Sequence, residues 1–155
     1  PHESEKALSY RDPDFDHLLI TGKIDLVEQT GEGIVRVTDF KTGSVKKKID
    51  IERDTHEGRL SDYHRQLAMY SYLIDGSSAG NTRVSESCLE FVEAKPISVY
   101  AVTIAQEDIQ KLRKDISDFD QLIISGDWMT RPCDFKAYKG QGECEYCLLS
   151  KKIYS

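Results

Sequence analysis

The 155-residue chain lacks a long apolar run, an excess of positive charge and a dense set of cysteines. No segment approaches the ~18 apolar residues that a membrane-spanning helix needs, so we expect no membrane partner. The formal net charge of −6 disfavours a protein that coats nucleic acid by bulk attraction, although it leaves a local nucleic-acid site open. The four cysteines are too few for a small disulfide scaffold, which indicates a reducing, cytoplasmic setting.

The length favours one domain, because typical domains have ~100–200 residues. The chain begins at Pro1 without an initiator methionine. We therefore expect residues 1–155 to be a single domain that is a piece of a longer chain. Residues 126–155 are expected to form an irregular tail, which holds three of the four cysteines.

The hydrophobic pattern predicts the element order β-β-α-β-β-α. Two strands, 18–28 and 34–42, are joined by a hairpin turn over 29–33 that contains two glycines. A polar stretch, 45–59, is predicted to form a surface loop. Apolar residues at spacings of three and four predict a helix over 60–76 and another over 109–123, with β-like runs at 88–93 and 97–104 between them. This order implies an α/β fold of the α+β type, with a mixed or antiparallel sheet flanked by helices.

Two carboxylates and a lysine are predicted to share one face of the first two strands. Asp39 and Lys41 lie two residues apart on a strand, so their side chains project from the same face. If the hairpin turn is centred near Gly31, Asp25 lies opposite Val37 and is the diagonal neighbour of Asp39. Such a group on an apolar sheet is costly unless a divalent cation is held there. The alternative is a solvated face with an exposed, weak ion pair.

The surrounding sequence resembles a known enzyme family. Its segments are Ile20-Thr21-Gly22-Lys23-Ile24-Asp25, then Asp39-Phe40-Lys41-Thr42-Gly43, then Gln66-Leu67-Ala68-Met69-Tyr70. Together they are similar to the RecB-type branch of the PD-(D/E)XK nucleases, over 18–74. The resemblance implies a restriction-endonuclease-like core with a central mixed sheet.

The resemblance also implies roles for individual residues. Asp25 and Asp39 would bind Mg²⁺ or Mn²⁺, with the Phe40 carbonyl oxygen as a third ligand, and Lys41 would be the catalytic lysine. Gln66 and Tyr70 would contact the substrate or order the site, since residues four apart lie on the same side of a helix. Tyr70 also belongs to the apolar stripe of its helix, so a core position is the alternative.

The function implied is a Mg²⁺-dependent DNA nuclease that hydrolyses phosphodiester bonds. Its expected context is the C-terminal module of a DNA repair or recombination helicase, with DNA and a motor region, in the same or a partner chain, as partners. The helices that family members carry upstream of the first strand are expected to be missing here. A catalytically inactive DNA-binding or scaffolding domain of the same fold is the alternative, and the net charge of −6 and the missing upstream motif are its support.

The cysteines are candidate ligands of a second cofactor, an iron–sulfur cluster. Some relatives hold an iron–sulfur cluster on four cysteines, and Cys144 and Cys147 resemble part of that tail. Cys133 could supply a third ligand, but such clusters need four ligands as a rule. Cys88 lies on a predicted strand, where a small buried hydrophobe is expected. We therefore expect no metal at the cysteines.

Overall fold

The computed structural model of the chain describes residues 2–127. The chain divides into one unit over Pro1–Asp120 and a second unit from Gln121 onward. The elements in chain order are β1 (His2–Tyr10), a 3₁₀ turn (Pro13–Phe15), β2 (Ile20–Gly31), β3 (Ile34–Lys41), α1 (Lys48–Glu52), α2 (Asp62–Ser77), β4 (Arg83–Phe91), β5 (Ser98–Val102) and α3 (Gln106–Ser125).

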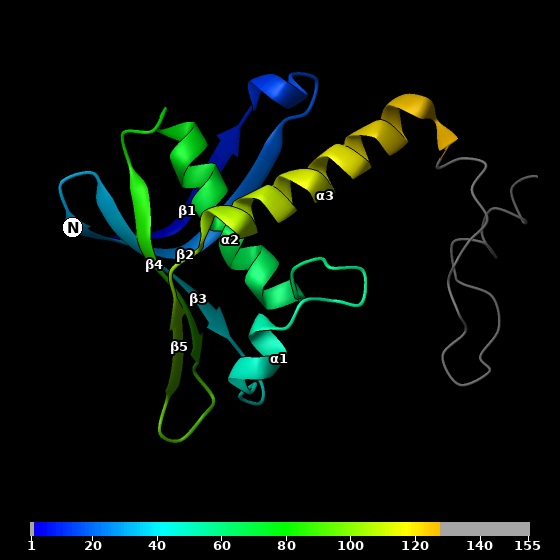
Figure 1. Ribbon diagram of the computed structural model, residues 1–155. Helices are drawn as coiled ribbons and strands as arrows, with labels where there is room; N and C mark the ends of the chain where they lie inside the picture. Colours follow the sequence, from blue (N-terminus) through cyan, green and yellow to red (C-terminus); the bar gives the residue numbers. More distant parts are fainter. Residues whose placement is uncertain (1, 128–155) are drawn as a thin grey trace, which may run out of the picture. The chain divides into compact units, whose positions relative to one another are not determined.

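The five strands form one mixed sheet in the order β1-β2-β3-β4-β5 (Figure 1). Strands β3 and β4 are parallel, whereas the other neighbours pair antiparallel. A parallel pair needs a crossover connection, and here the crossover carries α1 and α2. The predicted α+β fold with a mixed sheet flanked by helices is confirmed.

Besides the 3₁₀ turn, one strand and one α-helix were not predicted. Strand β1 is mostly polar and exposed, with a positive φ of 53° at Glu5, so its sequence does not show the alternation of a half-buried strand. It lies at the edge of the sheet, where only β2 pairs with it. Helix α1 forms inside the predicted surface loop, is five residues long and buries a single residue, Ile51. Neither element has a pattern long enough to stand out in the sequence.

The register between β2 and β3 differs from the predicted one by two residues. Strand β2 continues to Gly31, so the turn consists of Glu32 and Gly33, with Gly33 at a φ of 63°. An irregularity between Gln29 and Gly31 then shifts the pairing, so that Val27 lies opposite Val37 and Leu26 opposite Thr38. The predicted register, with Asp25 opposite Val37, is therefore wrong, because Val27 occupies that position.

Helix α2 lies between the sheet and α3 (Figure 1). Leu67, Tyr70 and Ile74 on one side of α2 join the main core with apolar residues of β2, β3 and β4. Ala68 and Tyr72 on its other side pack with Leu112 of α3. The predicted apolar stripe of this helix is thus confirmed as a core-facing stripe.

Close packing brings α2 onto β2 at a glycine. A Cβ atom at Gly22 would lie 2.6 Å from Leu73 Cδ1, and Leu73 is fully buried. A larger residue at position 22 would therefore require the Leu73 side chain to shift. Because α2 carries Gln66 and Tyr70, this contact helps to set their height above the sheet.

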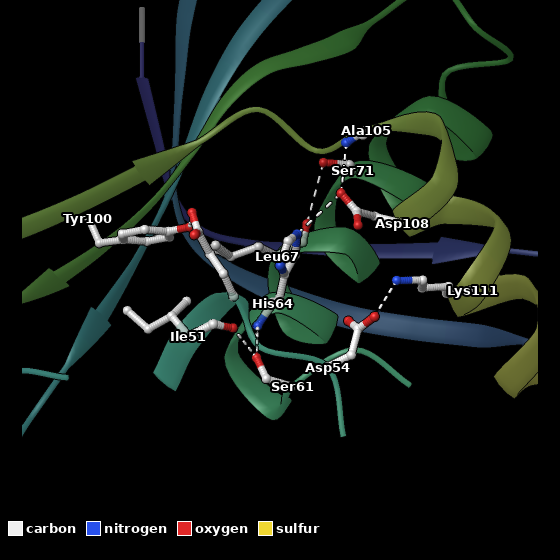
Figure 2. A network of polar contacts seen from close by, with 11 residues as sticks. Ile51, Asp54, Ser61, His64, Leu67, Ser71, Tyr100, Ala105, Asp108 and Lys111 are labelled. Atoms are coloured by element: carbon white, nitrogen blue, oxygen red, sulfur yellow. Dashed lines mark hydrogen bonds and ion pairs between the residues drawn. The ribbon is translucent and has the colours of Figure 1, made fainter. Parts of the chain in front are cut away.

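Polar contacts fix the start of α2 against α3 (Figure 2). Ser61 caps α2 by accepting a hydrogen bond from the His64 backbone N–H at 3.2 Å. His64 is buried, and its Nε2 lies 3.2 Å from Asp108 Oδ2 of α3. The Asp108 carboxylate also accepts from the Ala105 N–H at 2.9 Å, at the start of α3. The two helix starts are therefore tied to each other through His64 and Asp108.

Candidate active site

Asp39 is the most constrained acidic residue of the candidate site. It lies near the end of β3, is 3% exposed, and its Oδ1 accepts hydrogen bonds from Tyr70 Oη at 2.8 Å and Gln66 Nε2 at 2.6 Å. Its Oδ2 is buried without a well-aligned hydrogen bond, and the Lys41 Nζ lies 2.7 Å away. A buried carboxylate needs such partners, since an isolated charge is strongly disfavoured in an apolar interior.

Lys41 projects from the same face of β3 as Asp39, as predicted from their spacing. Its ammonium donates to Gln66 Oε1 at 2.6 Å in addition to its ion pair with Asp39. Its side chain is 22% exposed, so most of it is shielded from solvent. The Asp39–Lys41 pair is therefore not the exposed, solvated ion pair that was the alternative interpretation.

Helix α2 brings two of the predicted residues onto the Asp39–Lys41 pair. Gln66 and Tyr70 lie one turn apart, and Gln66 Nε2 also contacts Tyr70 Oη at 2.7 Å. Burial and the neighbouring Asp39 carboxylate raise the pKa of Tyr70 well above its ordinary value, so its hydroxyl stays protonated and donates to Asp39. Tyr70 is 6% exposed and belongs to the core cluster. Tyr70 therefore contacts the site residue Asp39 and also belongs to the core, which are the two roles that the sequence left as alternatives.

Asp25 completes the group from the neighbouring strand. Its Oδ2 accepts a hydrogen bond from the Phe40 backbone N–H at 2.9 Å, which holds the carboxylate against β3 beside Asp39. Asp25 is partly exposed, in contrast to Asp39. The structure thus gathers all five predicted side chains, Asp25, Asp39, Lys41, Gln66 and Tyr70, from β2, β3 and α2.

Tyr63 is a member of this site that the sequence did not indicate. Its ring lies 5.5 Å from the Lys41 Nζ, within the range of a cation–π contact. Tyr63 precedes Gln66 by one helical turn, so it faces the same side of α2. The sequence assigned it to the apolar stripe, and its spacing of three and seven from Gln66 and Tyr70 was the signal that could have found it.

The donor set fits a hard divalent cation. The oxygens of Asp25 and Asp39 are the ligand type that Mg²⁺ prefers, and the buried Asp39 Oδ2 has no hydrogen bond to satisfy it. Within residues 2–127 no group of three or more His, Cys, Asp or Glu side chains could hold a metal. Glu3 and Glu5 of β1 pair instead with Lys6 and Lys23. A bound cation would therefore rely on two carboxylates together with backbone oxygen or water.

Of the cysteines, only Cys88 falls within the described residues. It is 3% exposed and free, which confirms the small buried hydrophobe that was expected. Cys133, Cys144 and Cys147 lie outside the described residues, so the expectation of no metal at the cysteines stays a prediction.

Comparisons with known proteins agree with the fold. A family model of the PD-(D/E)XK nuclease superfamily matches residues 1–151. The chain is similar to the solved structure of SSO0001, with 15% identity, a TM-score of 0.49, and coverage of 97% of this chain and 58% of that one. It is also similar to a candidate exonuclease from Eubacterium rectale, with 11% identity, a TM-score of 0.50, and coverage of 96% and 56%. The chain thus spans little more than half the length of either protein. No curated protein matches the sequence.

Among the helices of residues 2–127, none combines the length and the apolar character that crossing a bilayer requires.

Proposed function

The chain belongs to the PD-(D/E)XK nuclease superfamily, and from this premise we propose that it is a Mg²⁺-dependent deoxyribonuclease, with Mn²⁺ able to replace Mg²⁺. Nucleases of this superfamily generally use divalent metals. The observation that carries the proposal is the contact on β3 between Asp39 Oδ2 and Lys41 Nζ at 2.7 Å. On the neighbouring strand β2, the Asp25 carboxylate is held against β3 by the Phe40 N–H. Carboxylates that hold a cation beside a lysine suit phosphodiester hydrolysis.

Asp25 and Asp39 would hold the metal. When bound, a divalent cation polarises a phosphoryl oxygen and favours deprotonation of a coordinated water. The protein's own contribution from these residues is to place two anionic oxygens on adjacent strands of a rigid sheet. Tyr70 and Gln66 orient the Asp39 carboxylate by donating to Oδ1, which leaves Oδ2 to the Lys41 ammonium.

Lys41 acts on the substrate. Its ammonium would contact the scissile phosphate, orient the attacking water and neutralise the negative charge that develops on the phosphate oxygens. The Gln66 amide oxygen accepts a hydrogen bond from the ammonium, and the Tyr63 ring makes a cation–π contact with the same ammonium. Hydrolysis adds water across one P–O bond and yields a phosphate monoester and an alcohol.

A narrower assignment follows from the sequence motifs. We place the chain in the RecB-like branch, as the nuclease module of a DNA repair or recombination helicase. The Asp39-Phe40-Lys41-Thr42-Gly43 strand and the helix with Gln66 and Tyr70 support this branch. The acidic net charge also supports a module that a motor region delivers to DNA, since a tether can supply an effective concentration of order mM.

The test is cleavage of labelled single-stranded and duplex DNA with Mg²⁺, with Mn²⁺ and with EDTA. The proposal expects metal-dependent degradation that Asp25→Asn abolishes while the variant stays folded by circular dichroism. The second candidate, a catalytically inactive DNA-binding or scaffolding domain, is favoured only by the net charge of −6. Binding of DNA without cleavage under every metal condition would support that candidate and overturn the nuclease.

A further inference from the structure

Unpaired positive charge is concentrated at one end of the sheet. Most Lys and Arg side chains of the described residues pair with a carboxylate, as Lys6, Lys23 and Arg113 do. Among the described residues, five have neither an ion pair nor a side-chain hydrogen bond: Lys46, Lys47, Arg53, Arg83 and Lys95. All five are exposed. In an acidic protein, cations left without partners need an explanation.

Four of the five lie at the end of the sheet that carries the candidate site. Lys46 and Lys47 follow β3, and Arg53 follows α1. Lys95 lies in the loop between β4 and β5, which leaves the sheet where Phe91 pairs with Lys41. The fifth, Arg83, begins β4 opposite Ile34, at the other end of the same strands.

Hydrogen bonds join the segments that carry these cations. The Gly43 N–H donates to Glu93 Oε2 at 2.7 Å, which ties the segment after β3 to the β4–β5 loop. Tyr100 Oη donates to Glu52 Oε1 at 2.8 Å, which ties β5 to the last residue of α1. Lys46 is five residues beyond Lys41, a reach of at most about 17 Å of extended chain. The four cations therefore lie on neighbouring segments beside the site.

The charge of this surface is opposite to that of the whole chain. Segments 41–53 and 92–97 together hold six Lys and Arg against three Asp and Glu, whereas the chain as a whole has a net charge of −6. On the other side of the site, the β1 lysine Lys6 and the β2 lysine Lys23 are both paired with glutamates. Apart from Arg83 at the far end of β3, unpaired positive charge among the described residues is thus available on one side of Asp39 and Lys41.

We propose that Lys46, Lys47, Arg53 and Lys95 form a track that binds the phosphodiester backbone of nucleic acid on one side of the scissile phosphate. This inference rests on the proposed function, because it takes Asp39 and Lys41 as the point of cleavage. Phosphate neutralisation by Lys and Arg supplies most of the sequence-independent affinity of proteins for nucleic acid. The track explains how an acidic chain presents a phosphate-binding surface without a basic surface overall.

The test is binding of a fluorescein-labelled DNA oligonucleotide in EDTA, where no metal-dependent cleavage interferes, over about 50 to 200 mM salt. Lys46→Gln, Lys47→Gln, Arg53→Gln and Lys95→Gln are combined in one variant and are also made singly. Arg83→Gln is the matched control, since it removes an equally exposed, equally unpaired cation from the far end. Log affinity falls with log salt, and we expect each single track variant to reduce the steepness of that fall by about 0.7 to 0.9, whereas Arg83→Gln should leave it unchanged.

An equal slope in the combined variant and the wild type would overturn the track. An equal fall for Arg83→Gln would also overturn it, because the effect would then come from net charge. Hydrolysis of a small chromogenic phosphodiester, too short to reach the track, tests the proposed function separately. The combined variant should hydrolyse it at the wild-type rate in Mg²⁺ or Mn²⁺. If the wild type cannot hydrolyse the small diester or DNA, the proposed function fails whatever the binding shows.

Discussion

The Lys41 ammonium donates to the Gln66 side-chain oxygen at 2.6 Å and so joins β3 to α2 at the candidate site. The nitrogen of the same amide donates to Asp39 at 2.6 Å, so one side chain contacts both members of the Asp39–Lys41 ion pair. The geometry of that pair is therefore set by the position of α2 as well as by β3.

Replacing Gln66 by Leu removes this link at similar volume. Asp39 and Lys41 keep their ion pair, but the ammonium loses an acceptor and can swing away from the substrate position. We expect DNA cleavage to fall by roughly 10- to 100-fold, in the range of losses from misplaced catalytic groups. The measurement is the single-turnover cleavage rate.

Arg65→Leu is the matched control, because Arg65 is the neighbouring residue on α2 and pairs only with the exposed Asp62. Its cleavage rate should equal that of the wild type. If Gln66→Leu behaves like Arg65→Leu, the positioning role of Gln66 is wrong.

Asp39→Asn tests the shared metal site through thermal stability. The wild type should gain melting temperature on addition of Mn²⁺, since an ion that binds only the folded state stabilises it. The substitution removes one anionic ligand and should thus remove that gain. The variant should also melt lower than the wild type without metal, because the Lys41 ammonium loses its 2.7 Å partner. A full Mn²⁺ response in the variant would exclude Asp39 as a ligand.

The sequence predicted the faces of this site better than its register. The two-residue spacing placed Asp39 with Lys41, and the four-residue spacing placed Gln66 with Tyr70, because both depend only on local periodicity. The pairing of β2 with β3 depends on a turn at Glu32 and Gly33 and on an irregularity after Gln29, which the glycine pattern did not distinguish from a turn centred at Gly31. The position of Asp25 relative to Asp39 could not be predicted for that reason.

Gly22→Ala should weaken the packing of α2 on β2. The added Cβ would meet Leu73 Cδ1 at 2.6 Å, so this fully buried side chain would have to shift. We expect the free energy of unfolding to fall by about 1–3 kcal/mol, as for other overpacked cores. Chemical denaturation measures this loss.

Gly22→Ala combined with Leu73→Ala provides the control. The second substitution opens the space that the new methyl group needs, so the double variant should lose less stability than the two single losses added together. Simple additivity would show that the two residues do not compete for space.

The stability of the fold should depend on pH through Asp12. Burial alone would raise the pKa of this carboxyl, but hydrogen bonds from Tyr72, the Asp14 N–H and Arg113 hold it below its ordinary value of 3.8. A carboxyl with a lowered pKa stabilises the fold above its unfolded pKa of about 3.9, and that contribution is lost as the pH falls through the folded value.

Asp12→Asn should therefore cost about 1–3 kcal/mol at neutral pH, and the difference from the wild type should shrink as the pH falls below about 4. Urea denaturation at several pH values measures it. A difference that stays constant down to strongly acidic pH would contradict the charged contacts of Asp12.

The most direct test of the central claim is the effect of Lys41→Ala on DNA cleavage. Because an ammonium is not a metal ligand, the variant should keep the Mn²⁺-dependent gain in melting temperature. Its single-turnover cleavage rate with saturating metal should fall by roughly 10²-fold or more, the scale of general acid–base assistance. Cleavage at the wild-type rate would contradict the assignment of Lys41, and with it the active site built around its pair with Asp39.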